Sequence, residues 1–196
     1  MPRIVDHEAR RRELTEALWR VIYRDGIETV SVRSVAAEAG CSPGALRHYF
    51  PEQKDLIVSA MDQMSGRAGE RITTLDPAGT PVDRLLAYCE QLIPMDAERR
   101  FEAEAWLGFI TRARRDADLK ELSTRVQHTL RGFLSHLLDE LGFDVGEAVR
   151  LHALVDGLTL HLLLYPEQLT PERAREQLRA HLVRLPRKDA GAAAPL

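Results

Sequence analysis

Apolar residues recur three and four positions apart along most of the chain, and no stretch shows the strict alternation of a half-buried strand. We therefore predict an all-α fold. A small N-terminal domain of three helices is expected over residues 1–57 and a larger helical domain over 58–185. The tail, 186–196, is rich in Ala and Pro and is predicted to be disordered.

The helix boundaries are marked by glycine, proline and capping residues. The turn-rich stretch 75–81 separates a long connecting helix from the helices that follow it. The helices are predicted over residues 6–25, 32–39, 43–49, 52–72, 82–93, 97–115, 117–141, 145–164 and 171–185.

The segment 31–57 combines two short helices with a tight turn. Ser31 is suited to cap the first helix, and Gly40 stands where a positive φ is needed. Ser42 can cap the second helix, which has Pro43 at its first position and cannot continue through Pro51. This order predicts a helix-turn-helix with a recognition helix at about 43–49, which would enter the major groove of DNA.

The second of these helices has few residues for a core of its own. Ala45, Leu46 and Phe50 can face inward, which leaves Arg47 and His48 outward with their neighbours. Small residues at the start of the helix let the backbone approach DNA, and the longer polar side chains can reach bases or phosphates. A surface helical hairpin without a DNA partner is the alternative.

The order of residues favours the DNA-binding helix-turn-helix over the surface hairpin. The run V-R-x-V-A-x-E-A-G-C-S-x-G-A-L-x-x-Y-F-x-x-x-K-D-L, which begins at Val32, resembles the N-terminal signature of TetR-family transcriptional regulators. The resemblance covers roughly Glu8 to Ile57. It implies a DNA-binding homodimer with a helical ligand-binding domain. Arg47 departs from the family, since many members carry an aromatic residue there, so the operator sequence is not carried over.

Two further segments, W-L-G-F from Trp106 and V-D-G-L-x-L-H-L-L-L from Val155, resemble one broad branch of the same family, whose ligands vary.

In the N-terminal domain, Lys54 lies in the first turn of a helix, where the helix dipole disfavours a cation unless a phosphate approaches. The resemblance points to the same lysine. The residues predicted to contact DNA are Arg33, Ser42, Pro43, Gly44, Ala45, Arg47, His48, Tyr49 and Lys54.

Charge and composition limit the classes of protein that fit. The formal net charge is −3, and the first fifty residues hold eight Lys or Arg against seven Asp or Glu, so DNA affinity must depend on where the cations lie. Two cysteines, Cys41 and Cys89, favour a reducing compartment. No run is apolar enough to span a bilayer or to direct secretion, so we expect a cytoplasmic protein without a membrane partner.

The helix predicted over 145–164 is apolar on nearly every side in its second half and therefore needs cover from more than one direction. Paired with the long helix before it, and with a second copy of both, it would form a four-helix bundle in a homodimer, where Gly132 and Gly157 allow close approach. A buried central helix in a monomer is the alternative. The predicted interface residues are Leu134, Leu138, Leu151, Val155, Leu158 and Leu162.

Aromatic and polar residues at inward positions of the later helices predict a small-molecule pocket, although such residues also form ordinary cores. Those assigned to the effector pocket are Tyr88, Cys89, Trp106, Phe109, Ile110, His128, Phe133, His152 and Asp156. His152 and Asp156, four residues apart, could orient a ligand, bind each other or pair across a dimer. No third ligand with suitable spacing supports a metal site, and no cofactor is predicted.

Together these patterns predict a ligand-responsive repressor that binds a palindromic operator as a homodimer and is released by an unknown small molecule. An enzyme with its pocket among the later helices is one alternative, but no catalytic set has recognisable spacing. A helical module that binds protein and not DNA is the other.

Overall fold

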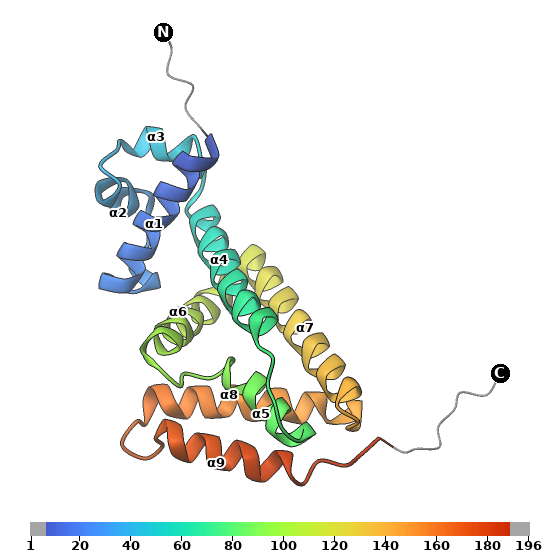
Figure 1. The fold of residues 1–196 in the computed structure, drawn as a ribbon. Helices are drawn as coiled ribbons and strands as arrows, with labels where there is room; N and C mark the ends of the chain where they lie inside the picture. Colours follow the sequence, from blue (N-terminus) through green and yellow to red (C-terminus); the bar gives the residue numbers. More distant parts are fainter. Residues whose placement is uncertain (1–6, 189–196) are drawn as a thin grey trace, which may run out of the picture. The chain divides into compact units, whose positions relative to one another are not determined.

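The computed structural model describes residues 7–188, and over this range it is helical with no strand (Figure 1). The prediction of an all-α fold is confirmed. The helices are α1 (His7–Asp25), α2 (Val32–Glu38), α3 (Pro43–Arg47), α4 (Gln53–Thr74), α5 (Pro81–Glu90), α6 (Ala97–Ala113), α7 (Ala117–Glu140), α8 (Ala148–Leu164) and α9 (Pro171–Leu182), with 3₁₀ turns η1 (Ile27–Thr29) and η2 (Val145–Glu147).

Several helices are shorter than the pattern predicts. The recognition helix ends at Arg47 and not at Tyr49, because the amide of Tyr49 bonds to the carbonyl of Leu46, three residues back, and so departs from the α-helical pattern. Helix α9 ends at Leu182, three residues early. The segment Val145–Glu147 is a separate 3₁₀ turn capped by Asp144, so α8 begins only at Ala148.

The chain divides into two compact units. The first comprises the described residues up to Arg67 together with 104–123, and the second comprises 68–103 together with the described residues from Thr124 onward. Helices α4, α6 and α7 each begin in one unit and end in the other. The two units are described separately below.

The first unit is built around the apolar face of α1. Leu14, Leu18 and Val21 of this helix are fully buried, as are Leu46 and Phe50 around α3. On the surface, Glu38 of α2 accepts hydrogen bonds from Arg20 and Arg24 of α1, each at 2.7 Å. These surface contacts add to the packing of α2 on the first unit, in which Val35 and Ala36 are buried.

Helix α6 packs closely on the same unit at Gly108. A Cβ atom at that position would overlap Cγ2 of Ile27, which is buried in η1. Cγ2 is attached directly to the Cβ of Ile27 and cannot swing away as the end of a long side chain would. Gly108 is therefore required by the close approach of the two segments.

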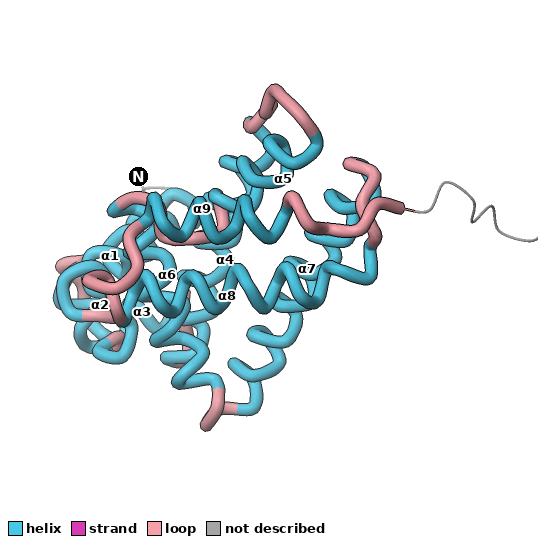
Figure 2. Tube along the Cα trace, turned by 90° about the horizontal axis from the view of Figure 1, so that it is seen from below, coloured by secondary structure: helices cyan, strands magenta, loops and turns pink. Residues whose placement is uncertain are grey.

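The second unit has a core made by α5, the later part of α7, α8 and α9. Figure 2 shows α8 and α9 side by side. Ion pairs on the surface join α9 to α5, with Arg175 bound to Glu90 and Arg179 to Asp83. The core residues are Leu85, Leu86, Cys89, Ile93, Leu134, Leu137, Leu138, Leu141, Phe143, Ala148, Leu151, Val155, Leu158, Leu162, Ala174, Leu178, Leu182 and Leu185.

The first residues of the predicted tail are ordered in this unit. Arg187 forms an isolated β-bridge with Phe143, and its guanidinium lies 4.2 Å from the centre of the Phe143 ring. Lys188 binds Asp139. These contacts place 186–188 against the second unit, whereas the sequence predicts a disordered tail that begins at 186. Residues 189–196 lie outside the described part of the chain.

Candidate nucleic-acid interface and effector region

Hydrogen bonds within the helix-turn-helix follow the capping pattern of the sequence. The hydroxyl of Ser31 accepts from the amide of Ser34 at 3.0 Å, and the Ser34 hydroxyl accepts from the Ser31 amide at 2.9 Å. Gly40 has a φ of 62°, and Ser42 accepts from the amide of Ala45 at 3.1 Å. The first turns of α2 and α3 are thus capped by residues next to them in sequence, which fixes where each helix begins.

Helix α3 has one face in the core and one in solvent. Leu46 and the following Phe50 are fully buried, whereas Arg47 and His48 are exposed and Tyr49 is half-buried. Ala45 is exposed and does not face inward as expected, because Leu46 alone occupies the inner side of this short helix. The other exposed residues of the predicted DNA set are Arg33, Ser42, Pro43 and Gly44.

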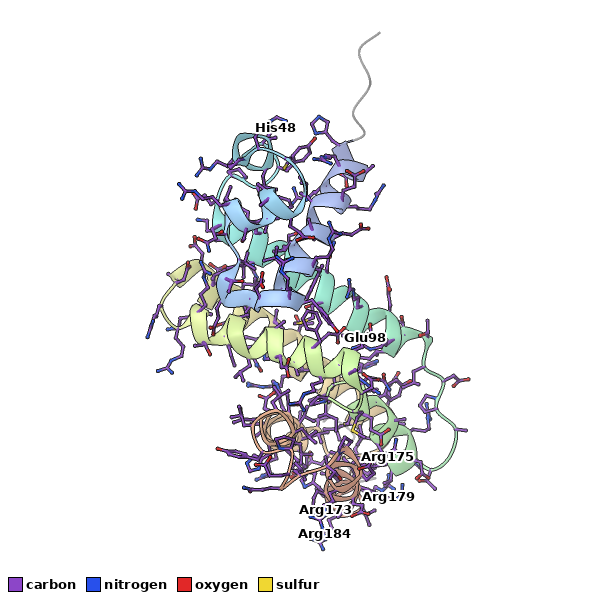
Figure 3. The ribbon with its side chains drawn as sticks, turned by 90° about the vertical axis from the view of Figure 1, so that its left-hand side faces the viewer. His48, Glu98, Arg173, Arg175, Arg179 and Arg184 are labelled. Atoms are coloured by element: carbon purple, nitrogen blue, oxygen red, sulfur yellow. The ribbon has the colours of Figure 1, made fainter. Side chains whose placement is uncertain are left out.

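Three aromatic rings gather at the end of α3, where Figure 3 labels His48. The rings of His48 and Tyr49 meet edge to face with centres 5.3 Å apart, and His7 lies 5.7 Å from His48 and 5.5 Å from Tyr49. His7 opens α1 and is distant from α3 in sequence, so periodicity alone could not indicate this contact. The cluster steadies the orientation of His48.

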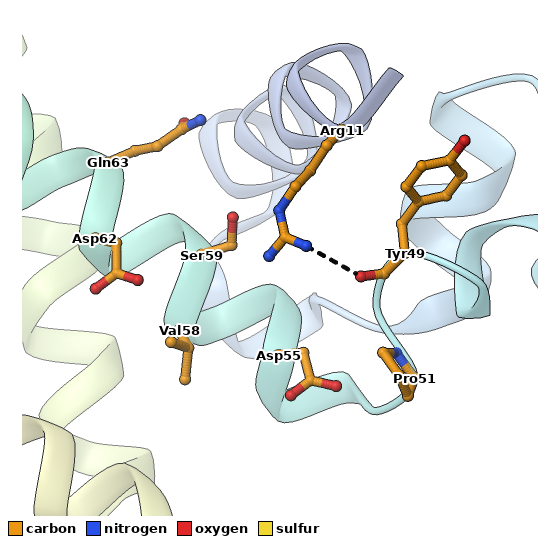
Figure 4. A pocket seen from close by; sticks show the side chains of 8 residues that line it. All are labelled: Arg11, Tyr49, Pro51, Asp55, Val58, Ser59, Asp62 and Gln63. Atoms are coloured by element: carbon orange, nitrogen blue, oxygen red, sulfur yellow. Dashed lines mark hydrogen bonds between the residues drawn. The ribbon is translucent and has the colours of Figure 1, made fainter. Parts of the chain in front are cut away.

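Arg11 supports the same region from α1. Its guanidinium lies 4.7 Å from the centre of the Phe50 ring and donates a hydrogen bond of 3.4 Å to the carbonyl of Tyr49. Beside it is an open hollow of about 580 Å³ on the first unit (Figure 4). The residues that line it are Arg11, Tyr49, Pro51, Asp55, Val58, Ser59, Asp62 and Gln63.

Lys54 is already paired within the protein. Its Nζ lies 2.7 Å from Oδ2 of Asp118 at the start of α7 and 3.2 Å from Oε2 of Glu52. The hydrogen bond from Lys54 to Asp118, together with the weaker contribution of Glu52, raises the pKa of the lysine. The sequence indicated the lysine but not Asp118, which is 64 residues further along the chain.

The residues assigned to an effector pocket are divided between the units. Tyr88, Cys89, Phe133, His152 and Asp156 belong to the second unit, where the rings of Tyr88 and Phe133 meet edge to face at 6.3 Å. Cys89 is enclosed in the core, and burial raises the pKa of its thiol to about 12.

Of the other four members of that set, three belong to the first unit, and His128 belongs to the second unit. Trp106, Phe109 and Ile110 belong to the first unit, and the rings of Trp106 and Phe109 are 5.2 Å apart. His128 is exposed on α7 and does not point inward as expected, because the buried face of this helix passes through Leu122 and Leu134.

His152 and Asp156 face each other on α8. His152 is 3% exposed, and its Nε2 lies 3.6 Å from Oδ2 of Asp156, too far for a hydrogen bond. Burial raises the pKa of the Asp156 carboxyl, while His152 acts in the opposite direction. The histidine is thus a buried polar group whose Nε2 has no hydrogen-bond partner among residues 7–188.

A second buried polar contact in this unit was not predicted from the sequence. Arg71 of α4 donates two hydrogen bonds to Glu102 of α6, at 2.9 and 2.6 Å, and Glu102 is buried. Arg100 of the same helix donates to the carbonyls of Leu162 and Leu163 at the end of α8. These arginines tie three helices together at positions where no apolar periodicity would reveal the contact.

The described residues contain no group of three or more His, Cys, Asp or Glu side chains placed to hold a metal ion. Within residues 7–188, no helix has both the length and the apolar character that crossing a membrane requires.

A capped two-helix turn with an exposed second helix, in a chain that also has a larger helical unit, is the architecture of helix-turn-helix regulators. Residues 14–61 match the family described as bacterial regulatory proteins of the tetR family, and residues 81–187 match the C-terminal domain of BetI-type transcriptional repressors. The chain belongs to the TetR family of transcriptional regulators. The matching family models and the related proteins are transcriptional regulators and not enzymes.

Related proteins can be aligned with this chain over most of their length. The chain is 36% identical over 191 residues to the transcriptional regulator PksA of Bacillus subtilis, with 93% of this chain and 92% of PksA covered. The crystal structure of a transcriptional regulator from Rhodococcus sp. Rha1 is 31% identical with a TM-score of 0.79, covering 88% and 94% of the two chains. A regulator from Saccharomonospora viridis, solved in complex with choline, shares the fold at 23% identity and a TM-score of 0.77, covering 92% and 100%.

Proposed function

We propose that this protein is a homodimeric repressor whose α3 helix reads a palindromic operator. The observation that carries this proposal is the division of α3 between a buried side, Leu46, and an exposed side with Arg47 and His48. A helix held in this way can offer its exposed side chains to base edges, while Arg33 and Lys54 contact the DNA backbone. The domain that carries these residues is proposed to span 1–57, and the ligand-binding and dimerisation domain 58–185.

The subunit contact is proposed to involve α8. The six residues that the sequence predicts at the subunit contact all lie in the core of the second unit, where the chain itself covers them. They are Leu134, Leu138, Leu151, Val155, Leu158 and Leu162. The same helix has a second apolar stripe that faces solvent. It consists of Val149, Ala153, Gly157, Leu160 and Leu164. An apolar stripe of this kind favours a partner, and a two-fold axis would place the same residues on both sides of the contact.

The effector is proposed to bind in the second unit and to release the operator. A ligand has this effect only if it binds the conformation that is incompetent for DNA more tightly than the competent one. The aromatic pair Tyr88 and Phe133 is of the type that receives quaternary ammonium groups. The choline complex of the Saccharomonospora protein makes choline the first compound to test.

The DNA proposal is tested by footprinting the purified protein on the DNA that flanks its own coding region, at two salt concentrations. We expect a protected palindrome and an affinity that falls steeply with salt, because phosphate contacts release counterions. Absence of protection there and in a selection from random duplexes would refute DNA binding.

The effector proposal is tested by adding choline to the protein–operator complex and measuring release by fluorescence anisotropy. The neutral isostere 3,3-dimethylbutanol is the matched control, since it keeps the shape of choline and lacks its charge. Release by choline alone supports a cationic effector. Release by neither compound would refute choline as the effector and leave DNA binding intact.

A further inference from the structure

The ammonium group of Lys54 already has anionic partners on the protein. It lies 2.7 Å from Asp118 and 3.2 Å from Glu52, all within the first unit. Asp118 is the closer partner, and the pair lowers the pKa of the Asp118 carboxyl as it raises that of Lys54. At neutral pH both groups are charged, so the lysine meets any approaching phosphate with its charge partly neutralised.

Asp118 is not required to begin α7. Oδ1 of Asp116 accepts hydrogen bonds from the amides of Asp118 and Leu119, at 3.1 and 3.2 Å, and so caps the helix. The side chain of Asp118 is 64% exposed, and its hydrogen bond goes to Lys54. The carboxylate is thus placed where its main interaction is with a lysine that we assign to the DNA backbone.

We propose that Asp118 sets the DNA affinity of this regulator by competing with an operator phosphate for Lys54. The inference rests on the proposed function, in which Lys54 is a phosphate contact. A phosphate brought to Nζ would either displace the Asp118 carboxylate or lie close beside it, and like charges at that distance repel. Either result weakens binding relative to a chain with a neutral side chain at position 118.

The position of Asp118 at the start of α7 bears on the regulation of DNA binding. Asp118 lies in the first turn of α7, and the same helix continues past Ser123 into the second unit, where Leu134 and Leu138 are core residues. The proposal therefore extends to the ligand response, in which a shift of α7 would change the distance between the Asp118 carboxylate and Lys54.

The test measures operator affinity and its salt dependence for Asp118→Asn. Glu70→Gln is the matched control, since Glu70 is exposed on α4 and its replacement changes the net charge by the same amount. We expect Asp118→Asn to tighten binding about two- to five-fold per reading head beyond the control, the range of an exposed ion pair, and this difference should shrink as salt screens the charges. Circular dichroism confirms that each variant is folded.

The Lys54→Met background separates competition from a general charge effect. There, adding Asp118→Asn should do no more than adding Glu70→Gln. The proposal is overturned if Asp118→Asn equals the control or weakens binding in the parent chain, or if Lys54→Met leaves affinity and salt slope unchanged while the parent binds its operator. A parent protein that binds no duplex at all would instead refute the proposed function, and the inference with it.

Discussion

At the scale of single residues, neighbouring positions on α3 have opposite environments. Leu46 is fully buried, while Arg47 beside it is exposed. Replacing Arg47 by Ala removes a side chain that can read a base, and leaves the core of the unit unchanged. We assign its role to sequence preference, whereas Lys54 would contribute to binding of any sequence.

We therefore expect Arg47→Ala to cost about 1–3 kcal/mol of binding free energy on the operator and to relax base preference at the contacted position. His48→Ala should also relax base preference. The control is Arg173→Ala, which removes the same charge from an exposed position on α9 (Figure 3). Selection from a randomised operator measures the preference. An unchanged preference in Arg47→Ala would refute base contact by this arginine.

Asp83 shows how local hydrogen bonds tune one carboxyl group. The hydroxyl of Thr80, the guanidinium of Arg179 and the amide of Thr80 all stabilise its charged form and hold its pKa at about 2. Because this value lies below that of the unfolded chain, about 3.9, the carboxylate contributes stability above about pH 4. That contribution is lost as the pH falls towards 2.

The corresponding prediction concerns Asp83→Asn. Its thermal midpoint should be lower than that of the parent at pH 7, and the difference should shrink as the pH falls from about 4 to about 2, because the Asp83 carboxyl of the parent becomes progressively protonated towards its pKa. Asp62→Asn, at an exposed position of α4, serves as the control. Calorimetry at several pH values measures both. A difference that stays constant over this pH range would contradict the assignment.

At the scale of elements, the contact between α6 and η1 depends on the absence of a side chain at Gly108. Glycine within a helix normally costs stability relative to alanine, so its presence here has a steric reason. Gly66 on α4 offers a comparison in the same unit, since nothing lies within 4 Å of a Cβ atom built there.

Gly108→Ala should therefore destabilise the protein by about 1–3 kcal/mol, the usual cost of overpacking. Gly66→Ala should instead stabilise it by about 0.5–1 kcal/mol. Adding Ile27→Ala to Gly108→Ala should cost less than the two single changes together, because the methyl group that clashes is removed. Urea denaturation gives the free energies. Equal effects of the two alanine substitutions would show that the close approach is absent.

At the scale of the whole molecule, the assignment of α8 to a subunit contact depends on its second apolar face. Leu160 and Leu164 are 40% and 50% exposed, and Val149 is 55% exposed. Their spacing places them on one side of the helix, opposite the core residues Leu151, Val155 and Leu162. A stripe of this kind would be covered in a homodimer.

Leu160→Glu should accordingly shift the protein from dimer to monomer in analytical ultracentrifugation, since a charge would then be buried in a subunit contact. Operator affinity should fall with it, because two linked reading heads bind far more tightly than one. Thr73→Glu, at another exposed helical position, should leave the dimer intact. A Leu160→Glu protein that remains dimeric would exclude this face of α8.

The sequence by itself determined the class of fold, the helix-turn-helix and its caps. Ser31, Gly40 and Ser42 act on backbone groups only a few residues away, so their roles depend on local geometry, which a sequence pattern records directly. The inner and outer sides of α3 also follow from helical spacing, except at Ala45. These local features sufficed to indicate the family.

Only the tertiary structure decided which side chains meet across the chain. The pairing of Lys54 with Asp118, the clustering of His7 with His48 and the contact of Gly108 with Ile27 join residues far apart in sequence. The tertiary structure also decided which face of α8 is covered. A helix that is apolar on nearly every side has no preferred inner face in its sequence, so its packing partners α7 and α9 select Leu151, Val155 and Leu162 for the core and leave Leu160 in solvent.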